Sequence, residues 1–382
     1  MMKKTMILAL FITGFALNSF GQESEKKKTI IELPQWVKNI KISGYGMLQY
    51  QADDKYSSAL DEEGNPIKNH ENAFNLRLMR LMMDGKIGDF AWRAQFQGSS
   101  NAGAGNPTVM LVDLYAEWQK YDFFRVKAGQ FKRAFTFENP TNPITQGWYA
   151  YALVINALSA FGDRSGEKSS SGRDIGLQIQ GDFLKNAAGR NLLHYQIGVY
   201  NGEGINQKDK DNRKDIIGGI WVMPVEGVRI GAFGWTGSRG DMNWVDAEGN
   251  AHNGSISKNR YALSAEYDKD EWTFRAEYIH SQGWGATKVD SRTVDFSKGD
   301  KADGFYVFGI VPVIKSKLHA KARYNIYRPT KEWSTSKTMY EVGLNYYITK
   351  NIQINAEYAR VNDRTLGKHN YNFADIQLDF RF

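Results

Sequence analysis

From residue 41 to residue 382 the chain repeats one pattern, in which apolar and polar side chains alternate over segments of about 9–13 residues. This period of two is typical of a β-strand with one apolar face. The clearest example is Thr338–Ile348, where Tyr340, Val342 and Leu344 alternate with polar or small residues. Few folds can accommodate so many consecutive strands that each have one apolar face. This pattern therefore constrains the fold more than any other feature.

The connectors between these segments alternate in length. Sixteen segments begin near residues 41, 74, 90, 109, 123, 173, 192, 215, 228, 258, 272, 303, 317, 338, 352 and 372. Seven connectors are short and eight are long, including 52–73, 139–172 and 239–257. Sixteen up-and-down strands produce this count if both ends of the strand region lie on the side of the short turns.

A bilayer explains both regularities. It forbids unpaired backbone groups, so a sheet crosses it only by closing on itself. The sequence therefore predicts an all-β fold, a transmembrane antiparallel barrel of about 16 strands over residues 41–382. A soluble β-sandwich or propeller would explain the alternation, but not the connector lengths or the terminal aromatic residue. Phe380 and Phe382 are predicted to form a C-terminal assembly signal, and aromatic residues near strand ends, such as Trp221 and Trp272, an interfacial girdle.

The N-terminus reads as an export signal. Lys3 and Lys4 precede the apolar stretch Met6–Leu17, which is too short to span a bilayer, and small residues follow it. We expect a cleaved signal peptide over residues 1–21, then a short periplasmic segment over 22–40. Together with the barrel pattern, this predicts location in the cell outer membrane, with membrane lipid as a partner.

Residues that could carry out catalysis are scarce. The chain has no Cys, which excludes thiol nucleophiles and Cys-based zinc sites, and its six His are dispersed. The formal charge of +7 is too mild and too spread out to indicate nucleic-acid binding. The sequence predicts no enzyme, no metal, no cofactor and no nucleic-acid partner.

Charged residues on the inward face favour transport. With the apolar residues assigned to lipid, nine basic and eight acidic side chains face inward. Rows of charge are how pores select ions, and two sets on this face are locally basic. Together with Arg93 they give the predicted pore-lining residues, which are Arg93, Arg125, Lys127, Lys317, His319, Lys321 and Arg323. The alternative is a charge lattice that only stabilises the barrel wall.

Loop 139–172 is the longest connector, and its stretch 143–162 is unusually apolar for an external loop. We expect this loop to fold into the lumen. The alternatives are that it grips a neighbouring protomer or packs beneath other loops. The predicted constriction residues are Trp148, Tyr149, Tyr151, Asp163 and Arg164.

Segment Phe74–Lys86 does not fit a regular strand, because Arg77 and Arg80 cannot both face inward without a β-bulge. Segment Val228–Ser238 carries bulky residues on both faces, so its inward face remains unassigned.

The amino-acid sequence of three stretches, 76–96, 112–138 and 172–183, resembles that of the phosphate-selective porin O and P family. The matching positions are Arg77 and Arg80, Asp113, Tyr115 and Trp118, Gly129 to Lys132, Phe135 and Glu138, and Gly172 to Gly176. The resemblance implies a sixteen-stranded trimeric porin whose third external loop enters the lumen. It also implies phosphate sites on lumenal arginines and lysines, of which Arg77, Arg80 and Lys132 can be matched here.

These observations predict an outer-membrane porin, expected as a homotrimer, that passes small hydrophilic solutes or ions, anions such as phosphate among them. The alternative is a plugged barrel that serves as a structural or assembly subunit of a larger outer-membrane complex, with other outer-membrane proteins as partners.

Overall fold

The computed structural model describes residues 40–99, 108–159, 161–165, 172–246, 248–284, 287–288, 293–296 and 299–382. The predicted signal peptide, residues 1–21, lies outside the described residues, as does the predicted periplasmic segment except for Ile40.

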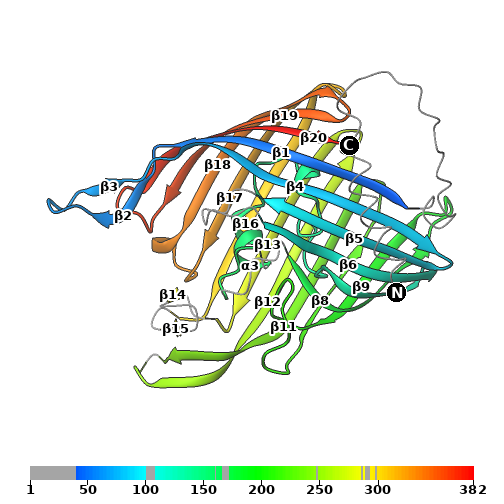
Figure 1. The fold of residues 1–382 in the computed structure, drawn as a ribbon, viewed down its shortest axis with the longest axis horizontal. Coiled ribbons are helices and arrows are strands. Elements are labelled where there is room, and N and C mark those ends of the chain that lie inside the picture. The colour runs from blue at the N-terminus through cyan, green and yellow to red at the C-terminus, as the bar shows by residue number, and fades with distance from the viewer. Residues whose placement is uncertain are drawn as a thin grey trace, which may run out of the picture. The chain divides into compact units, whose positions relative to one another are not determined.

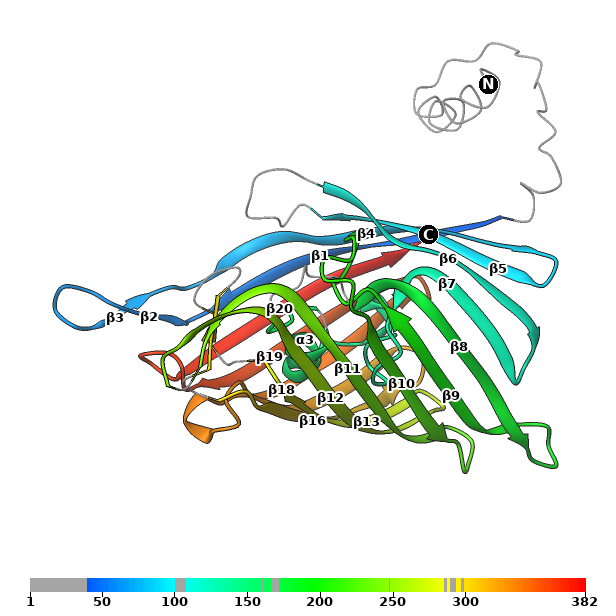
Figure 2. The same ribbon diagram turned by 90° about the horizontal axis from the view of Figure 1, so that it is seen from below.

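In the described part of the chain, sixteen antiparallel strands form one closed barrel (Figures 1 and 2). Each barrel strand pairs with the next along the chain, and the last pairs with the first, from Tyr45 opposite Arg381 to Asp53 opposite Phe373. The strands are β1 (Lys41–Asp53), β4 (Asn72–Ile87), β5 (Phe90–Ser99), β6 (Thr108–Tyr121), β7 (Phe124–Lys132), β8 (Arg173–Lys185), β9 (Asn191–Tyr200), β10 (Asp215–Val222), β11 (Val228–Val245), β12 (Ala251–Lys269), β13 (Trp272–Gln282), β16 (Ala302–Ile314), β17 (Leu318–Arg328), β18 (Lys337–Thr349), β19 (Ile352–Asp363) and β20 (Asn370–Arg381).

The predicted barrel is confirmed, and all but one strand begin within two residues of the predicted start. The exception is β12, which begins at Ala251 rather than near 258. Predicted loop 239–257 is mostly an extended hairpin, because β11 and β12 continue to pair beyond a register shift between Arg239 and Met242. The polar composition of this stretch indicated a loop, yet strands that leave the membrane need no apolar face.

Residues on the two faces of the wall differ as the alternation requires. On β20, Ile376 is 51% exposed on the outside, while Asp375, Gln377 and Asp379 are fully buried within. A bilayer favours this apolar outer face, and the polar inner side chains satisfy one another. No helix among the described residues is long and apolar enough to cross a membrane.

The predicted bulge in the second barrel strand is present. The pairing of β1 with β4 shifts register between Met47 and Leu48, so Arg77 is the extra residue of the bulge. Arg77 donates to the Gln377 side chain on β20 at 2.6 Å, and Arg80, three positions along the chain, is buried. The extra residue therefore lets both arginines face inward.

Loop 3 (residues 133–172) connects β7 to β8, and its described residues, 133–159 and 161–165, fold into the lumen, as predicted. It contains a 3₁₀ turn, Pro143–Thr145, and the short helix α3 (Leu153–Leu158). In Figures 1 and 2 α3 lies inside the barrel, and it contacts β13, β16 and β17.

Other connectors carry small elements. Hairpin β2 (Tyr56–Leu60) and β3 (Pro66–Lys68) lies between β1 and β4. Strands β14 (Thr287–Lys288) and β15 (Thr293–Asp295) pair with each other, and β15 also pairs with β11. A 3₁₀ turn spans Trp333–Thr335.

Candidate pore and its lining

Carboxylates of the barrel wall hold the backbone of loop 3. The two oxygens of Glu277 on β13 accept the N–H groups of Phe137 and Glu138, each at 2.8 Å. Glu357 on β19 accepts the N–H of Tyr149 at 2.7 Å. These are charge-assisted hydrogen bonds in a buried setting, so they fix the path of the loop against this side of the wall.

Lys321 and Arg323 on β17 donate hydrogen bonds to the backbone of the same loop. Lys321 Nζ donates to the Gly147 carbonyl and to Glu357, both at 2.6 Å. Arg323 donates to the Ala150 carbonyl at 3.0 Å. Both cations are 4% exposed or less, so loop 3 covers them. The predicted basic row does face inward here, but its charges are engaged with carboxylates and with the loop.

The other two members of the predicted row lie near the short-turn end. His319 Nε2 is 3.0 Å from a carboxylate oxygen of Glu271. Lys317 does not lie on the strand at all: it is exposed in the turn before β17, with Nζ 5.3 Å from the ring of Tyr346. The structure therefore does not bring Lys317 together with Lys321.

The predicted constriction residues are packed against the wall or within the loop. Trp148 is buried between Lys321 and Arg323, at 4.9 and 4.4 Å from its ring. Tyr149 packs on Phe373 and Tyr151 on Phe161, with ring centroids 4.7 and 4.1 Å apart. Asp163 forms a two-bond ion pair with Arg260, and the buried guanidinium nitrogens of Arg164 have no hydrogen-bond partner in the part of the chain that the structure describes.

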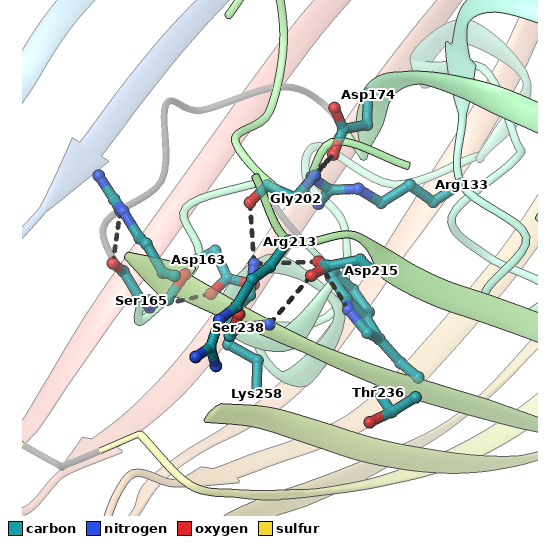
Figure 3. A network of polar contacts seen from close by, with 12 residues as sticks. Arg133, Asp163, Ser165, Asp174, Gly202, Arg213, Asp215, Thr236, Ser238 and Lys258 are labelled. Atoms are coloured by element: carbon teal, nitrogen blue, oxygen red, sulfur yellow. Dashed lines mark hydrogen bonds and ion pairs between the residues drawn. The ribbon is translucent and has the colours of Figure 1, made fainter. Parts of the chain in front are cut away.

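A further network of polar contacts connects the start of loop 3 to the loop between β9 and β10 (Figure 3). Arg133 pairs with Asp174 at 2.5 Å, and both side chains are fully buried. Asp174 also accepts the N–H of Gly202, whose carbonyl accepts from Lys258 at 2.9 Å. Lys258 in turn pairs with Asp215 at 3.0 Å. These links join β8, β10 and β12, so they brace the start of loop 3.

Loop 3 leaves an open space on the opposite side of the lumen. A cavity of about 340 Å³ lies between the start of loop 3 and the wall formed by β5 to β11. We call these strands the open wall. The charged side chains that line the cavity are Arg93, Asp113, Lys127, Lys132, Arg133, Arg173 and Arg229. Six are basic and one is acidic, in contrast to the balanced count over the whole barrel.

Two cations of the open wall line the cavity while their carboxylate partners do not. Arg93 pairs with Asp84 and Arg229 with Glu266, at 2.7 and 2.6 Å, and neither carboxylate lines the cavity. The lining is therefore richer in basic than in acidic side chains.

Lys132 is a basic residue of the lining that has no ion pair among the described residues. Its Nζ donates to the carbonyls of Asn139 and Thr141, at 2.5 and 2.7 Å, and lies 3.2 Å from the hydroxyl of Tyr151. These contacts orient the Lys132 side chain at the start of loop 3.

Of the seven predicted pore-lining residues, the structure therefore places two at the cavity, Arg93 and Lys127. Arg125 pairs with Asp182 at 2.6 Å and does not line it. Sequence reasoning missed His194 and Arg229, and it assigned Trp221 to the interfacial girdle, whereas all three line the cavity. Arg229 lies four residues before the buried Phe233 and so on the same face of β11, but bulky residues on both faces of this segment hid the inward face in the sequence.

A closed barrel of sixteen strands with its third loop in the lumen is the architecture of outer-membrane porins. Residues 45–204, from β1 to the loop after β9, match the model of the phosphate-selective porin O and P family, as the sequence resemblance predicted. No curated protein matches the chain in sequence.

Solved outer-membrane porins share the fold at low identity. OmpF of Salmonella typhi, solved with daunomycin, is 13% identical with a TM-score of 0.59, covering 90% of this chain and 97% of its own. The channel DcaP of Acinetobacter baumannii is 10% identical with a TM-score of 0.57, covering 90% and 98%. OmpT of Vibrio cholerae, folded in vitro and in its trimer form, is 11% identical with a TM-score of 0.51, covering 90% and 99%. These likenesses show the fold.

Proposed function

We propose that the protein is an outer-membrane porin that passes small hydrophilic solutes by diffusion and prefers anions, phosphate included. The observation that carries the preference is the lining of the cavity, where six basic side chains face one acidic side chain. Low-dielectric walls focus such a field and raise the local concentration of anions.

Reversal potentials across a planar bilayer under a salt gradient test this proposal. The wild-type pore should prefer chloride over potassium, and the variant Arg93→Glu with Lys127→Glu should shift toward potassium, most at low salt. Lys120→Glu is the matched control, because Lys120 is exposed and does not line the cavity. An unchanged reversal potential in the double variant would remove the open wall from the permeation path.

A second candidate function is a plugged barrel with a structural or assembly role. It is favoured by how firmly loop 3 is held, since Glu277, Lys321 and Arg323 all bind its backbone. The same bilayer measurement separates the two functions, because a plugged barrel inserts without carrying current.

We further propose that the protein assembles as a homotrimer and is exported with cleavage after Gly21. The trimer form of the related OmpT fold supports the first proposal, and residues 1–21 support the second. Light scattering of the detergent-purified protein and N-terminal mass spectrometry test them.

A further inference from the structure

The cavity at the open wall is lined by aromatic rings as well as cations. Tyr115, Phe131, Phe137 and Trp221 all contribute to its lining. An inorganic anion would use only the cations and would gain nothing from these apolar faces. The rings therefore indicate a solute that has an apolar face of its own.

Rings and cations alternate at contact distance along this lining. Lys127 Nζ lies 5.0 Å from the ring centre of Tyr115 and 5.5 Å from that of Phe131. The guanidinium carbon of Arg229 lies 4.1 Å from the ring centre of Phe137. A solute with a charged group beside a ring could contact both kinds of surface in one position.

Two polar groups at the cavity retain hydrogen-bonding capacity. Lys127 Nζ comes no nearer than 3.5 Å to Glu117, whose oxygens already accept from Gln119 and Gln180. His194 stacks on Trp221 with ring centres 4.0 Å apart, and its buried Nε2 has no hydrogen-bond partner among the described residues.

Other cations of the lining are already engaged. Arg173 forms two hydrogen bonds to Asp113, and Arg133 is locked to Asp174 (Figure 3). Arg229 uses only its Nε toward Glu266 among the described residues, at 2.6 Å, so its two terminal guanidinium nitrogens can still donate. Charge recognition at the aromatic part of the cavity therefore falls to Lys127 and to these nitrogens of Arg229, with His194 beside them.

The size of the cavity agrees with this chemistry. Its volume of about 340 Å³ corresponds to roughly eleven water molecules at liquid density. This is more room than a single phosphate fills, and enough for a six-membered ring with one charged substituent.

From these contacts we propose that the cavity selects carboxylates that carry a six-membered ring. The carboxylate is bound by Lys127 and Arg229, and the ring lies against Tyr115 and Trp221. This inference rests on the proposed porin function and adds a solute class to it. Aromatic acids and ring-form sugar acids share this chemistry, and the experiment distinguishes them.

The test measures block of chloride current through single pores by matched pairs of anions at neutral pH. Benzoate is compared with hexanoate, and the ring sugar acid glucuronate with open-chain gluconate. The ring member of at least one pair should block at a roughly two- to tenfold lower concentration, as one additional aromatic contact would produce. The pair that shows the difference identifies the source of the ring.

Variants locate the effect. Trp221→Leu and Tyr115→Leu should remove the preference for rings, and Lys127→Gln should weaken block by every carboxylate. Trp272→Leu and Lys120→Gln are matched controls, since both residues are exposed outside the cavity and should leave block unchanged. Folding of each variant is checked by the heat-dependent shift of its band on a gel and by its chloride current.

Equal block within both pairs, or a ring preference that survives both aromatic variants, would overturn the solute class while leaving a conducting porin. Absence of any chloride current in the inserted wild-type protein would instead overturn the proposed function, and this inference with it.

Discussion

Arg323 and Glu341 form a two-bond ion pair across strands β17 and β18, with Nε and Nη2 donating to the carboxylate at 2.6 and 2.7 Å. Both side chains are almost fully buried, and the arginine also reaches the Ala150 carbonyl of loop 3. The pair therefore joins the barrel wall and the loop in one contact.

Replacing Arg323 with Met should destabilise the protein by about 3–5 kcal/mol, because the Glu341 charge would stay buried without its partner. The measurement is the temperature at which the folded band shifts on a gel, together with noise in single-channel current. The double variant Arg323→Met with Glu341→Leu should recover much of the loss, since no unpaired charge remains. Equal loss in both variants would contradict this account.

Glu277→Gln should loosen the start of loop 3. The carboxylate accepts two backbone N–H groups and the hydroxyl of Ser264. It also accepts the hydroxyl of Tyr306 at 2.6 Å. An amide has only one oxygen to accept, and each buried donor left unpaired costs about 1–3 kcal/mol. We expect faster protease cleavage within loop 3, whereas Glu248→Gln, at an exposed loop position, should leave the cleavage rate unchanged.

The attachment of loop 3 should depend on pH through Glu138. Burial raises the pKa of this loop carboxyl to about 7, with Glu277 adding to the rise while Arg323 and Arg275 oppose it. A raised folded-state pKa means that the favourable contribution is complete below about pH 4.5 and is lost as pH rises through about 7. Current noise should therefore increase from pH 5 to pH 8, and Glu138→Gln should flatten this profile. A variant that keeps the wild-type profile would assign the pH response to another group.

Deleting Phe382 should reduce membrane insertion. Its backbone N–H and carbonyl both bond Gly44, at 3.0 and 2.9 Å, and its ring occupies the space that a Cβ at Gly44 would need. Deletion removes both of these backbone hydrogen bonds between β1 and the C-terminus. Gly44→Val should hinder the same closure of the barrel, because its side chain would need the space that the Phe382 ring occupies. The yield of heat-modifiable protein measures the effect. Deletion of an exposed loop aromatic such as Trp333 is the control, and equal yields would refute the assembly signal.

Single cysteines should report the topology, because the chain has no other Cys. Glu62→Cys, between β1 and β4, and Glu248→Cys, at the tip of the extended β11–β12 hairpin, should react with an impermeant maleimide on intact cells. Asp122→Cys, in a short turn, should react only after lysis. The reverse pattern would invert the orientation of the barrel.

The strand positions could be predicted from sequence because each barrel strand must keep one apolar face toward lipid. That constraint acts on each residue separately, so the alternation of apolar and polar residues such as Ile376 and Asp375 predicts which side chains face outward and inward. It even exposed the bulge at Arg77, where the alternation fails. The extension of β11 and β12 past residue 239 could not be predicted in this way, because strands outside the membrane need no apolar face.

The candidate site was predicted less well, because it depends on contacts between residues far apart in the chain. The sequence predicts Lys321 as a lumenal charge, but only the fold shows that Glu357 pairs with it and that loop 3 covers it, with the Gly147 carbonyl accepting a hydrogen bond. Trp221 sits near a strand end like a girdle aromatic, and only its pairing with His194 shows that it turns inward.

Because loop 3 is held mainly by one side of the barrel, inward residues on the two sides have different roles. Inward residues of β12 to β20 hold the loop, so substitutions there should be selected mainly through protein abundance. Apart from Asp174 and Asp215, which brace the start of loop 3, inward residues of β5 to β11 that line the cavity can change which solutes enter while the barrel still assembles. Selection for a different solute could therefore act within residues 90–245 and leave most contacts of loop 3 unchanged.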